Sequence, residues 1–210
     1  MNIELWFDVV CPWCYLGKHR LESVLREFPG EVTITCRAYQ LDPAPVPEPV
    51  PLKRAMAARV PQTDRLLAQV TEVAAAEGLQ LDFDRAIAAN TFDAHRIIAW
   101  AAGQELQLLM VETLQRAHFT DGVDIGSHAE LARLAGSIGL DERAALAYLG
   151  SPAGTDAVNA DLAEARELGI TSVPTFVIDR KFVVQGAQEA AVLRSALDEI
   201  ARREAVDAPL

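Results

Sequence analysis

The sequence predicts an α/β fold into which a long helical segment is inserted. Three observations carry this prediction. A strand–helix–strand pattern opens the chain over residues 3–39, a helical pattern dominates residues 52–150, and a helix–strand–strand–helix pattern closes the chain from residue 155. The chain has 210 residues, half of them apolar, which is enough for a buried core in one or two domains.

The opening unit contains three elements. Residues 3–8 form a short apolar run that predicts a strand, and residues 12–28 predict a helix that Pro29 and Gly30 end. Residues 32–39 alternate with period two, which is typical of a strand with one buried face. A strand, a helix and a strand of these lengths predict a right-handed unit with parallel strands.

A proline-rich stretch leads out of this unit. Proline stands at positions 43, 45, 47, 49 and 51, which favours an extended chain without ladder hydrogen bonds. Residues 52–150 are then helical in pattern, apart from a short strand-like piece over 79–83. Helices are predicted over 62–77, 84–88, 92–103, 105–119, 127–138 and 141–149.

The closing unit begins with an amphipathic helix over 155–168. Two apolar runs, 170–179 and 182–185, are joined by a charged turn and predict a β-hairpin. A helix over 188–203 follows, and residues 204–210 are predicted to be a frayed tail.

The order of these elements is that of a thioredoxin-like fold with an all-helical domain inserted. The sequence therefore predicts two domains. Residues 1–45 and 155–210 form the thioredoxin-like domain, and residues 46–154 form the helical insertion domain.

The composition argues against several classes of protein. The net charge is −11 without a basic cluster, which makes nucleic acid and anionic membranes poor partners. No apolar run is long enough to cross a bilayer. Glu4 and Asp8 interrupt the apolar start, so no secretory leader is predicted, and with Met1 as the native start we expect a cytoplasmic protein.

Cys11-Pro12-Trp13-Cys14 lies at the junction of the first strand and the first helix. A C-x-x-C pair in this context is typical of a thioredoxin-like redox site. The exposed N–H groups at a helix start favour an anion, so we expect Cys11 to react as a thiolate. Cys14 is placed to close a disulfide, Pro12 suits the first helical turn, and the Trp13 ring can shape a partner-binding surface.

Half of a zinc site is the alternative interpretation of this pair. A structural zinc site needs four ligands, often two such pairs or one pair with two spaced histidines. The only other cysteine is Cys36, and the histidines at positions 19, 95, 118 and 128 are scattered. The sequence therefore favours a redox dithiol that requires no metal and no organic cofactor.

A second candidate element is Thr171-Ser172-Val173-Pro174-Thr175. A proline at a strand start is usually an edge or entry device. In a thioredoxin fold with an N-terminal C-x-x-C, however, this position holds a cis-proline loop beside the dithiol, so we expect a cis bond at Pro174. The backbone of Val173 could then pair with an extended substrate peptide.

The chain resembles the DsbA family of thiol–disulfide oxidoreductases. Within that family it is most similar to the cytoplasmic FrnE-like branch, which is related to 2-hydroxychromene-2-carboxylate isomerases and kappa-class glutathione transferases. Four segments carry the resemblance over essentially the whole chain: residues 8–17 (DVVCPWCYLG), 90–96 (NTFDAHR), 169–176 (GITSVPTF) and 184–188 (VQGAQ). The first and third segments are the specific ones.

The resemblance implies a redox-active Cys11–Cys14 pair with Cys11 as the nucleophile. It also implies that Asn90 and His95 approach the active-site cleft. The isomerase and transferase relatives place a serine at the position of Cys11 and use it to activate glutathione. Cysteine at this position moves the expected chemistry toward dithiol–disulfide exchange.

Several residues have a structural interpretation beside the functional one. Asn90 could cap the following helix. His95 could shuttle protons, although a surface histidine is the default expectation. Asp8 could accept a proton from the dithiol, although a strand-end residue facing water is slightly favoured. Cys36 is expected to be a buried, inert thiol, and Lys18 is expected on a solvated helix face.

The resulting prediction is a thiol–disulfide oxidoreductase that acts on disulfide- or thiol-containing proteins, as a monomer or homodimer. Glutathione is a further candidate partner. The alternative functions are a glutathione-dependent isomerase or transferase acting on a small aromatic substrate, and a non-catalytic binding module with the same fold.

Overall fold

The computed structural model describes residues 1–46 and 48–207. Its main sheet has the strand order β2-β1-β5-β6. Strands β1 and β2 are parallel, whereas β5 is antiparallel to β1 and to β6. The strands span Asn2–Phe7 (β1), Thr33–Ala38 (β2), Thr175–Ile178 (β5) and Phe182–Gln185 (β6).

Strand β1 lies between β2 and β5 and is buried on both faces. Leu5 is the register partner of Cys36 on one side and of Phe176 on the other. Ile3, Leu5, Trp6 and Phe7 are all almost fully buried. This explains why the strand is a nearly continuous apolar run rather than an alternating one.

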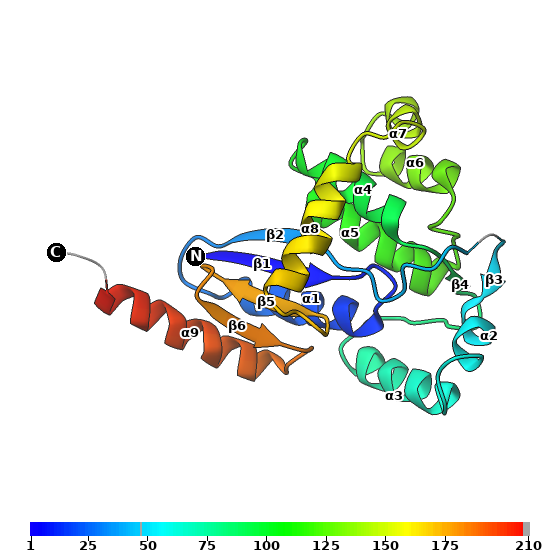
Figure 1. Cartoon of the computed structure of the whole chain (residues 1–210). Coiled ribbons are helices and arrows are strands. Elements are labelled where there is room, and N and C mark those ends of the chain that lie inside the picture. Colours follow the sequence, from blue (N-terminus) through cyan, green and yellow to red (C-terminus); the bar gives the residue numbers. More distant parts are fainter. Residues whose placement is uncertain (47, 208–210) are drawn as a thin grey trace.

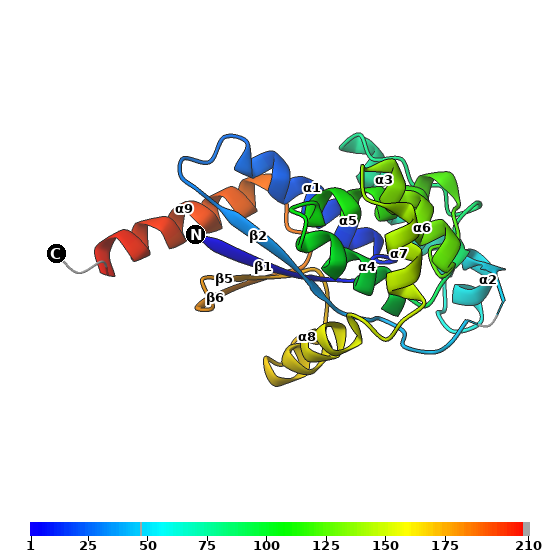
Figure 2. The ribbon, with the colours of Figure 1, turned by 90° about the horizontal axis from the view of Figure 1, so that it is seen from above.

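Helices cover both faces of the sheet (Figures 1 and 2). Helices α1 (Pro12–Leu25) and α9 (Ala190–Asp207) pack against each other on one face. Helix α8 (Thr155–Glu167) crosses the opposite face and packs against β2. The arrangement confirms the predicted α/β class and the thioredoxin-like fold.

The remaining helices gather toward the carboxyl end of β1, where α5 also packs against β2 (Figure 2). They are α2 (Leu52–Ala57), α3 (Thr63–Ala76), α4 (Phe92–Ala102), α5 (Gln107–Arg116), α6 (His128–Ser137) and α7 (Glu142–Leu149). Helix α5 continues directly into a π-helical turn, η1 (Ala117–Asp121). This largely helical segment lies between β2 and α8 along the chain.

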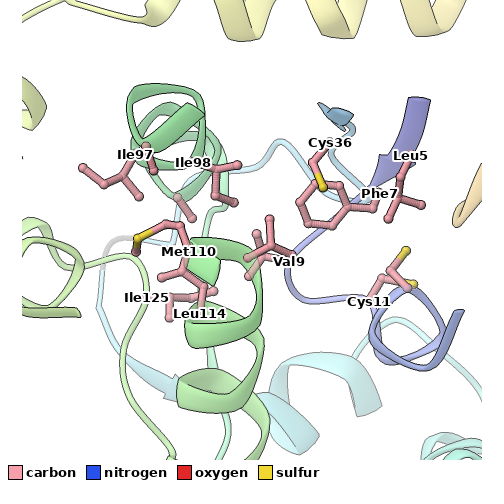
Figure 3. Packing of buried hydrophobic residues seen from close by; sticks show 14 of the residues in the cluster. Leu5, Phe7, Val9, Cys11, Cys36, Ile97, Ile98, Met110, Leu114 and Ile125 are labelled. Atoms are coloured by element: carbon pink, nitrogen blue, oxygen red, sulfur yellow. The ribbon is translucent and has the colours of Figure 1, made fainter. Parts of the chain in front are cut away.

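One apolar core joins the sheet to the helical segment. Figure 3 shows Phe7 and Val9 from the region of β1 facing Ile98 of α4 and Leu114 of α5. Cys11 belongs to the same cluster of buried residues. The start of α1 is therefore fixed by packing from both parts of the molecule.

Arg96 of α4 is the main polar link within the helical segment. Its buried guanidinium donates to the carbonyl groups of residues at the end of α7 and in the turn that leads to α8, namely Tyr148, Leu149, Ser151 and Ala153. It also forms an ion pair with Asp93 at 2.6 Å. These contacts satisfy carbonyl groups that a helix end leaves unpaired.

The predicted helix over 84–88 is wrong. The Asp82 carboxylate accepts hydrogen bonds from the backbone of Asp84 and Arg85 and forms a turn there. Ile87–Ala88 then forms strand β4, which pairs antiparallel with β3 (Val50–Pro51). The extended proline-rich stretch therefore does make a short ladder, while Pro47 lies outside the described residues.

Other element boundaries also differ from the predictions. Helix α2 was not predicted, and residues 79–83 form no strand, although Leu79 and Phe83 are buried. Residues 204–207 belong to α9 rather than to a frayed tail, and residues 208–210 lie outside the described residues. These segments are too short for a periodic pattern to show whether they form a helix, a strand or a turn.

The outer edge of strand β2 is occupied by side chains. The Gln107 amide accepts from the Cys36 backbone N–H at 3.0 Å and donates to its carbonyl at 3.0 Å. The Asp161 carboxylate accepts from the Ala38 N–H at 2.9 Å. Side chains thus take hydrogen-bonding positions that another strand would fill.

Within the described residues, none of the helices has the length and apolar character that are needed to cross a membrane.

Candidate active site

The candidate site is the Cys11–Cys14 pair at the start of α1. Cys11 is the N-cap residue, with extended backbone angles (φ −89°, ψ 110°), and Pro12 is the first helical residue. The Cys11 N–H donates to the Asp8 carbonyl at 3.1 Å, and the Cys11 carbonyl accepts from the Cys14 N–H at 3.0 Å. This tight turn brings the two thiols, which are free, onto the first turn of the helix.

The two thiols differ in their surroundings. Cys11 retains 4% of its surface exposed, two residues before the exposed Trp13, whereas Cys14 is fully buried. Burial raises the pKa of the Cys14 thiol well above its ordinary value, and the hydrogen bond with Cys11 raises it further. Cys11 is therefore the thiol that a partner can reach, and Cys14 is the one held protonated in the interior.

The loop before β5 faces Cys11. The Val173–Pro174 peptide bond is cis, and the Cys11 Sγ lies 3.8 Å from the Val173 carbonyl oxygen. Among the described residues, the Val173 N–H has no hydrogen-bond partner. The loop is held by a hydrogen bond from the Gly186 N–H to the Pro174 carbonyl at 2.8 Å.

Asp8 lies directly behind the dithiol and is fully buried, not exposed at the strand end as expected. Its Oδ2 accepts from the Leu41 N–H at 2.8 Å, whereas Oδ1 has no hydrogen-bond partner. The Asp8 backbone hydrogen-bonds to Cys14, and the carboxylate charge raises the pKa of the Cys14 thiol. A buried carboxylate thus lies next to the buried thiol.

Sequence reasoning missed a second set of buried polar groups. Both ring nitrogens of His118 and both amide atoms of Gln115 are buried without a hydrogen-bond partner. His118 lies on η1, and π-helical turns frequently occur at functional sites. Burial lowers the pKa of this imidazole to about 4, against the opposing effect of Asp8. Nothing in the helical pattern distinguished His118 from a surface residue.

The low pKa of His118 predicts acid lability. Between about pH 6.5 and pH 4 the unfolded chain binds a proton at this imidazole and the folded chain does not. The free energy of unfolding should therefore fall as the pH drops through this window, by up to about 3 kcal/mol. Denaturant unfolding at several pH values measures this loss.

Two leucine variants isolate this contribution. On acidification, His118→Leu should lose less stability than the native chain, because it lacks the imidazole whose protonation favours the unfolded state. The loss that comes from the carboxylates is common to both proteins. His19→Leu is the control and should keep the native pH dependence, because it alters a histidine that is not fully buried and that makes no hydrogen bond or ion pair among the described residues. Equal losses in the native chain and in His118→Leu would contradict the assignment.

His95 lies in the interior next to Asp8, whereas Asn90 is partly exposed just before α4. Asn90 accepts from the Phe92 N–H at 3.0 Å at the start of α4 and donates to the carbonyls of Pro43 and Ala44. It therefore pairs the first N–H of α4, whose N-cap residue is Thr91, and also fixes the chain that follows β2. His95 is buried, and its Nε2 lies 3.0 Å from the Tyr39 carbonyl oxygen. The surface histidine expected here is wrong.

Lys18 is also buried, contrary to the expected solvated position. Its Nζ contacts Glu112 of α5 at 2.7 Å and Glu22 at 2.9 Å. The Tyr15 hydroxyl donates to the same Glu112 carboxylate at 3.0 Å. Glu112 therefore holds the dithiol helix against α5, a role that the sequence alone did not suggest.

Cys36 is buried, as its position in the alternating strand predicted. Burial raises the pKa of its thiol to about 12. Within the described residues, no three His, Cys, Asp or Glu side chains gather in a way that could hold a metal ion.

The fold and the site define a thioredoxin-fold protein with a dithiol at a helix start. The family described as the DSBA-like thioredoxin domain matches residues 2–198. The chain belongs to this family, which confirms the resemblance seen in the sequence.

Solved structures agree with this assignment. A probable DsbA oxidoreductase from Streptomyces coelicolor is 35% identical, with a TM-score of 0.88 over 95% of this chain and 89% of its own. A 2-hydroxychromene-2-carboxylate isomerase shares the fold at 18% identity, with a TM-score of 0.75 over the whole of both chains. The cytosolic disulfide reductase DsbM from Pseudomonas aeruginosa, solved with GSH, does so at 22% identity, with a TM-score of 0.66 over 96% of this chain and 100% of its own. These neighbours include both oxidoreductases and an isomerase, in agreement with the FrnE-like branch.

Proposed function

We propose that this protein is a thiol–disulfide oxidoreductase that exchanges disulfides through Cys11 and Cys14. The observation that carries the proposal is the asymmetry of the pair: Cys11 is the accessible thiol at the helix start, and Cys14 is enclosed behind it. Family membership supports an enzyme of this general type.

The exchange proceeds through a mixed disulfide. In the reducing direction the Cys11 thiolate attacks a substrate disulfide and releases the first substrate thiolate. Cys14 then loses its proton and attacks the Cys11 sulfur, which closes the Cys11–Cys14 disulfide and releases the second substrate thiolate. The reverse sequence oxidises two substrate thiols. No metal or organic cofactor enters these steps.

The Val173 backbone would align the substrate. Its unpaired N–H, next to the carbonyl that lies 3.8 Å from the Cys11 sulfur, suits an extended peptide that adds as a short strand. The exposed Trp13 ring and Pro12 would contact the same peptide from the helix side. Disulfide- or thiol-containing proteins are therefore the proposed substrates.

Asp8 would accept the proton of Cys14 during resolution. A fully buried thiol cannot lose its proton directly to bulk water, and Asp8 is the neighbouring carboxylate that acts on it. The unpaired Oδ1 leaves one lone-pair position available for that proton.

Packing between α1 and the Val173–Pro174 loop makes Gly17 a sensitive position. A Cβ at Gly17 would lie 2.8 Å from Pro174 Cγ and would contact Ala187. Gly17→Ala should push the loop away from Cys11, lowering the rate of insulin reduction by about tenfold and the free energy of unfolding by about 1–3 kcal/mol. Gly103→Ala, where the nearest neighbour is a carbonyl oxygen at 3.5 Å, is the matched control. If both variants retain native rates, the loop does not need this close contact.

Glutathione is a second proposed partner, and a cytoplasmic location is proposed with it. The neighbouring disulfide reductase DsbM is described as cytosolic and was solved with GSH. The alternative function, a glutathione-dependent isomerase or transferase, has an isomerase of the same fold in its favour. The cysteine at position 11 favours exchange, because a C-x-x-C pair can carry two electrons and a single nucleophile cannot.

A redox titration separates the two functions. After equilibration in glutathione buffers, alkylation and mass spectrometry should show Cys11 and Cys14 changing together as one two-electron couple, with Cys36 constant. The protein should also reduce insulin when glutathione is replaced by dithiothreitol. A pair that never forms a disulfide, or activity that depends strictly on glutathione, would favour the isomerase or transferase.

A further inference from the structure

A pocket lies behind the dithiol, on the opposite side of Asp8. It has a volume of about 260 Å³ and lies between β2, α4 and α8. His95 and Asp161 line its inner part, and Ala157 and Ala160 line it from exposed positions on α8. This volume is several times that of one water molecule in the liquid, about 30 Å³.

His95 separates Asp8 from this pocket. Its Nε2 lies 3.4 Å from the Asp8 Oδ1 and 3.0 Å from the Tyr39 carbonyl oxygen. With its proton on Nε2 the ring donates to the carbonyl, and with its proton on Nδ1 it presents the Nε2 lone pair toward the unpaired Asp8 oxygen. Nδ1 has no hydrogen-bond partner among the described residues and is not one of the fully enclosed unpaired atoms, so it retains contact with the pocket.

We propose that His95 is the exit for the proton that Asp8 takes from Cys14, and that it passes this proton to water in the pocket behind β2. This inference rests on the proposed function, because it concerns the resolving step of the same reaction. In this proposal His95 passes a proton and does not contact the substrate. The resemblance to the family had instead suggested that His95 approaches the active-site cleft.

The proton balance of this route is complete. Cys14 gives its proton to Asp8 and becomes the thiolate that closes the disulfide. The carboxyl proton of Asp8 passes to Nε2 of His95 in the tautomer that carries its own proton on Nδ1, and the resulting imidazolium releases the Nδ1 proton to water. The ring is left with its proton on Nε2, which donates to the Tyr39 carbonyl. When the Cys11–Cys14 disulfide is reduced again, the reverse transfer returns a proton from Nε2 through Asp8 to Cys14, and Nδ1 takes a proton from water, which restores the starting tautomer.

The charges around His95 suit this role. Asp8 faces the ring from the end of β1, and Asp161 of α8 and Arg37 of β2 line the same pocket. Arg37 forms an ion pair with Asp161 at 2.8 Å, so the pocket wall is close to neutral. His118 also interacts with Asp8, but its two nitrogens are fully enclosed and give a proton no way out.

Stopped-flow reaction with an aromatic disulfide that releases a chromophoric thiolate tests the proposal. The first thiolate reports the attack by Cys11 and the second reports resolution by Cys14. His95→Gln keeps a hydrogen-bond donor for the Tyr39 carbonyl, but an amide cannot accept and release a proton. Release of the second thiolate (the second phase) should therefore slow by about tenfold at pH 7, while release of the first stays within twofold. His128→Gln is the matched control, because it alters a histidine away from the pocket.

Imidazole rescue excludes a purely structural role for His95. In His95→Ala, added imidazole should enter the pocket and restore the second phase in proportion to the concentration of its free base, with no effect on the first. If these variants do not fold, Ala160→Met narrows the pocket from an exposed position and should slow the second phase severalfold.

A native second phase in folded His95→Gln, or in Ala160→Met, would overturn the proton route. In that case the first phase would still report a reactive Cys11, so the proposed function would stand. If instead the native chain releases no thiolate in a Cys11-dependent manner, the proposed function itself fails.

Discussion

Cys11→Ser is expected to abolish disulfide exchange. Its hydroxyl is far less acidic than a thiol and cannot form the mixed disulfide, so the rate of insulin reduction should fall by at least about a thousandfold. Cys14→Ser should behave differently, because Cys11 can still attack but nothing resolves the product. Mass spectrometry should then detect a trapped mixed disulfide on Cys11 after incubation with a disulfide substrate.

Cys36→Ala provides the control for these two variants. Its thiol is buried and its pKa is raised to about 12, so it should take no part in exchange. The variant should retain the native turnover and should form no mixed disulfide at position 36. A Cys11→Ser protein with substantial insulin reduction would disprove the dithiol mechanism, whatever the behaviour of Cys14→Ser.

Arg96→Met is expected to cause the largest loss of stability. The methionine removes a buried cation that donates to four carbonyl groups and pairs with Asp93. The Tyr148 carbonyl keeps a hydrogen bond from Ser151, and Asp93 keeps its contact with His128. The carbonyls of Leu149, Ser151 and Ala153 would lose a buried charged donor, which costs about 3–5 kcal/mol. For a chain of this length the melting temperature should fall by about 10 °C.

Arg133→Met is the matched control for this variant. Arg133 is half-exposed and pairs only with Glu130 on the same helix, at 2.7 Å. Such surface pairs contribute less than about 1 kcal/mol, so its melting temperature should change little. Similar losses in the two variants would show that the buried network around Arg96 does not hold α4 to the turn between α7 and α8.

The larger part of the fold could be predicted from the sequence because the patterns there are long. The alternation over 32–39 and the apolar run over 3–8 gave strands β2 and β1, and the two runs after Gly169 gave the hairpin of β5 and β6. The errors lie in short segments, such as β3 and β4, whose two-residue strands exist only because Val50 meets Ala88 in space. A contact between residues this far apart in the sequence leaves no local sequence pattern.

The motif residues of the site could also be predicted, because Cys11, Cys14 and Pro174 belong to short motifs. The buried polar groups behind it could not. Asp8, His95, His118 and Lys18 are polar residues whose burial depends on elements far away in the sequence. Propensity places such residues at the surface, and only their partners in the folded chain reveal that they are enclosed.

The side chains that occupy the edge of β2 have a consequence for which proteins this chain can bind. A bare sheet edge accepts any extended chain, including another copy of the same protein, and is a common start for aggregation. Gln107 takes both backbone groups of Cys36, and Asp161 takes the N–H of Ala38, so this edge offers incoming peptides little to pair with. In the proposed function a substrate peptide pairs with the Val173 backbone, and the closed edge of β2 removes one competing position for that peptide on the sheet.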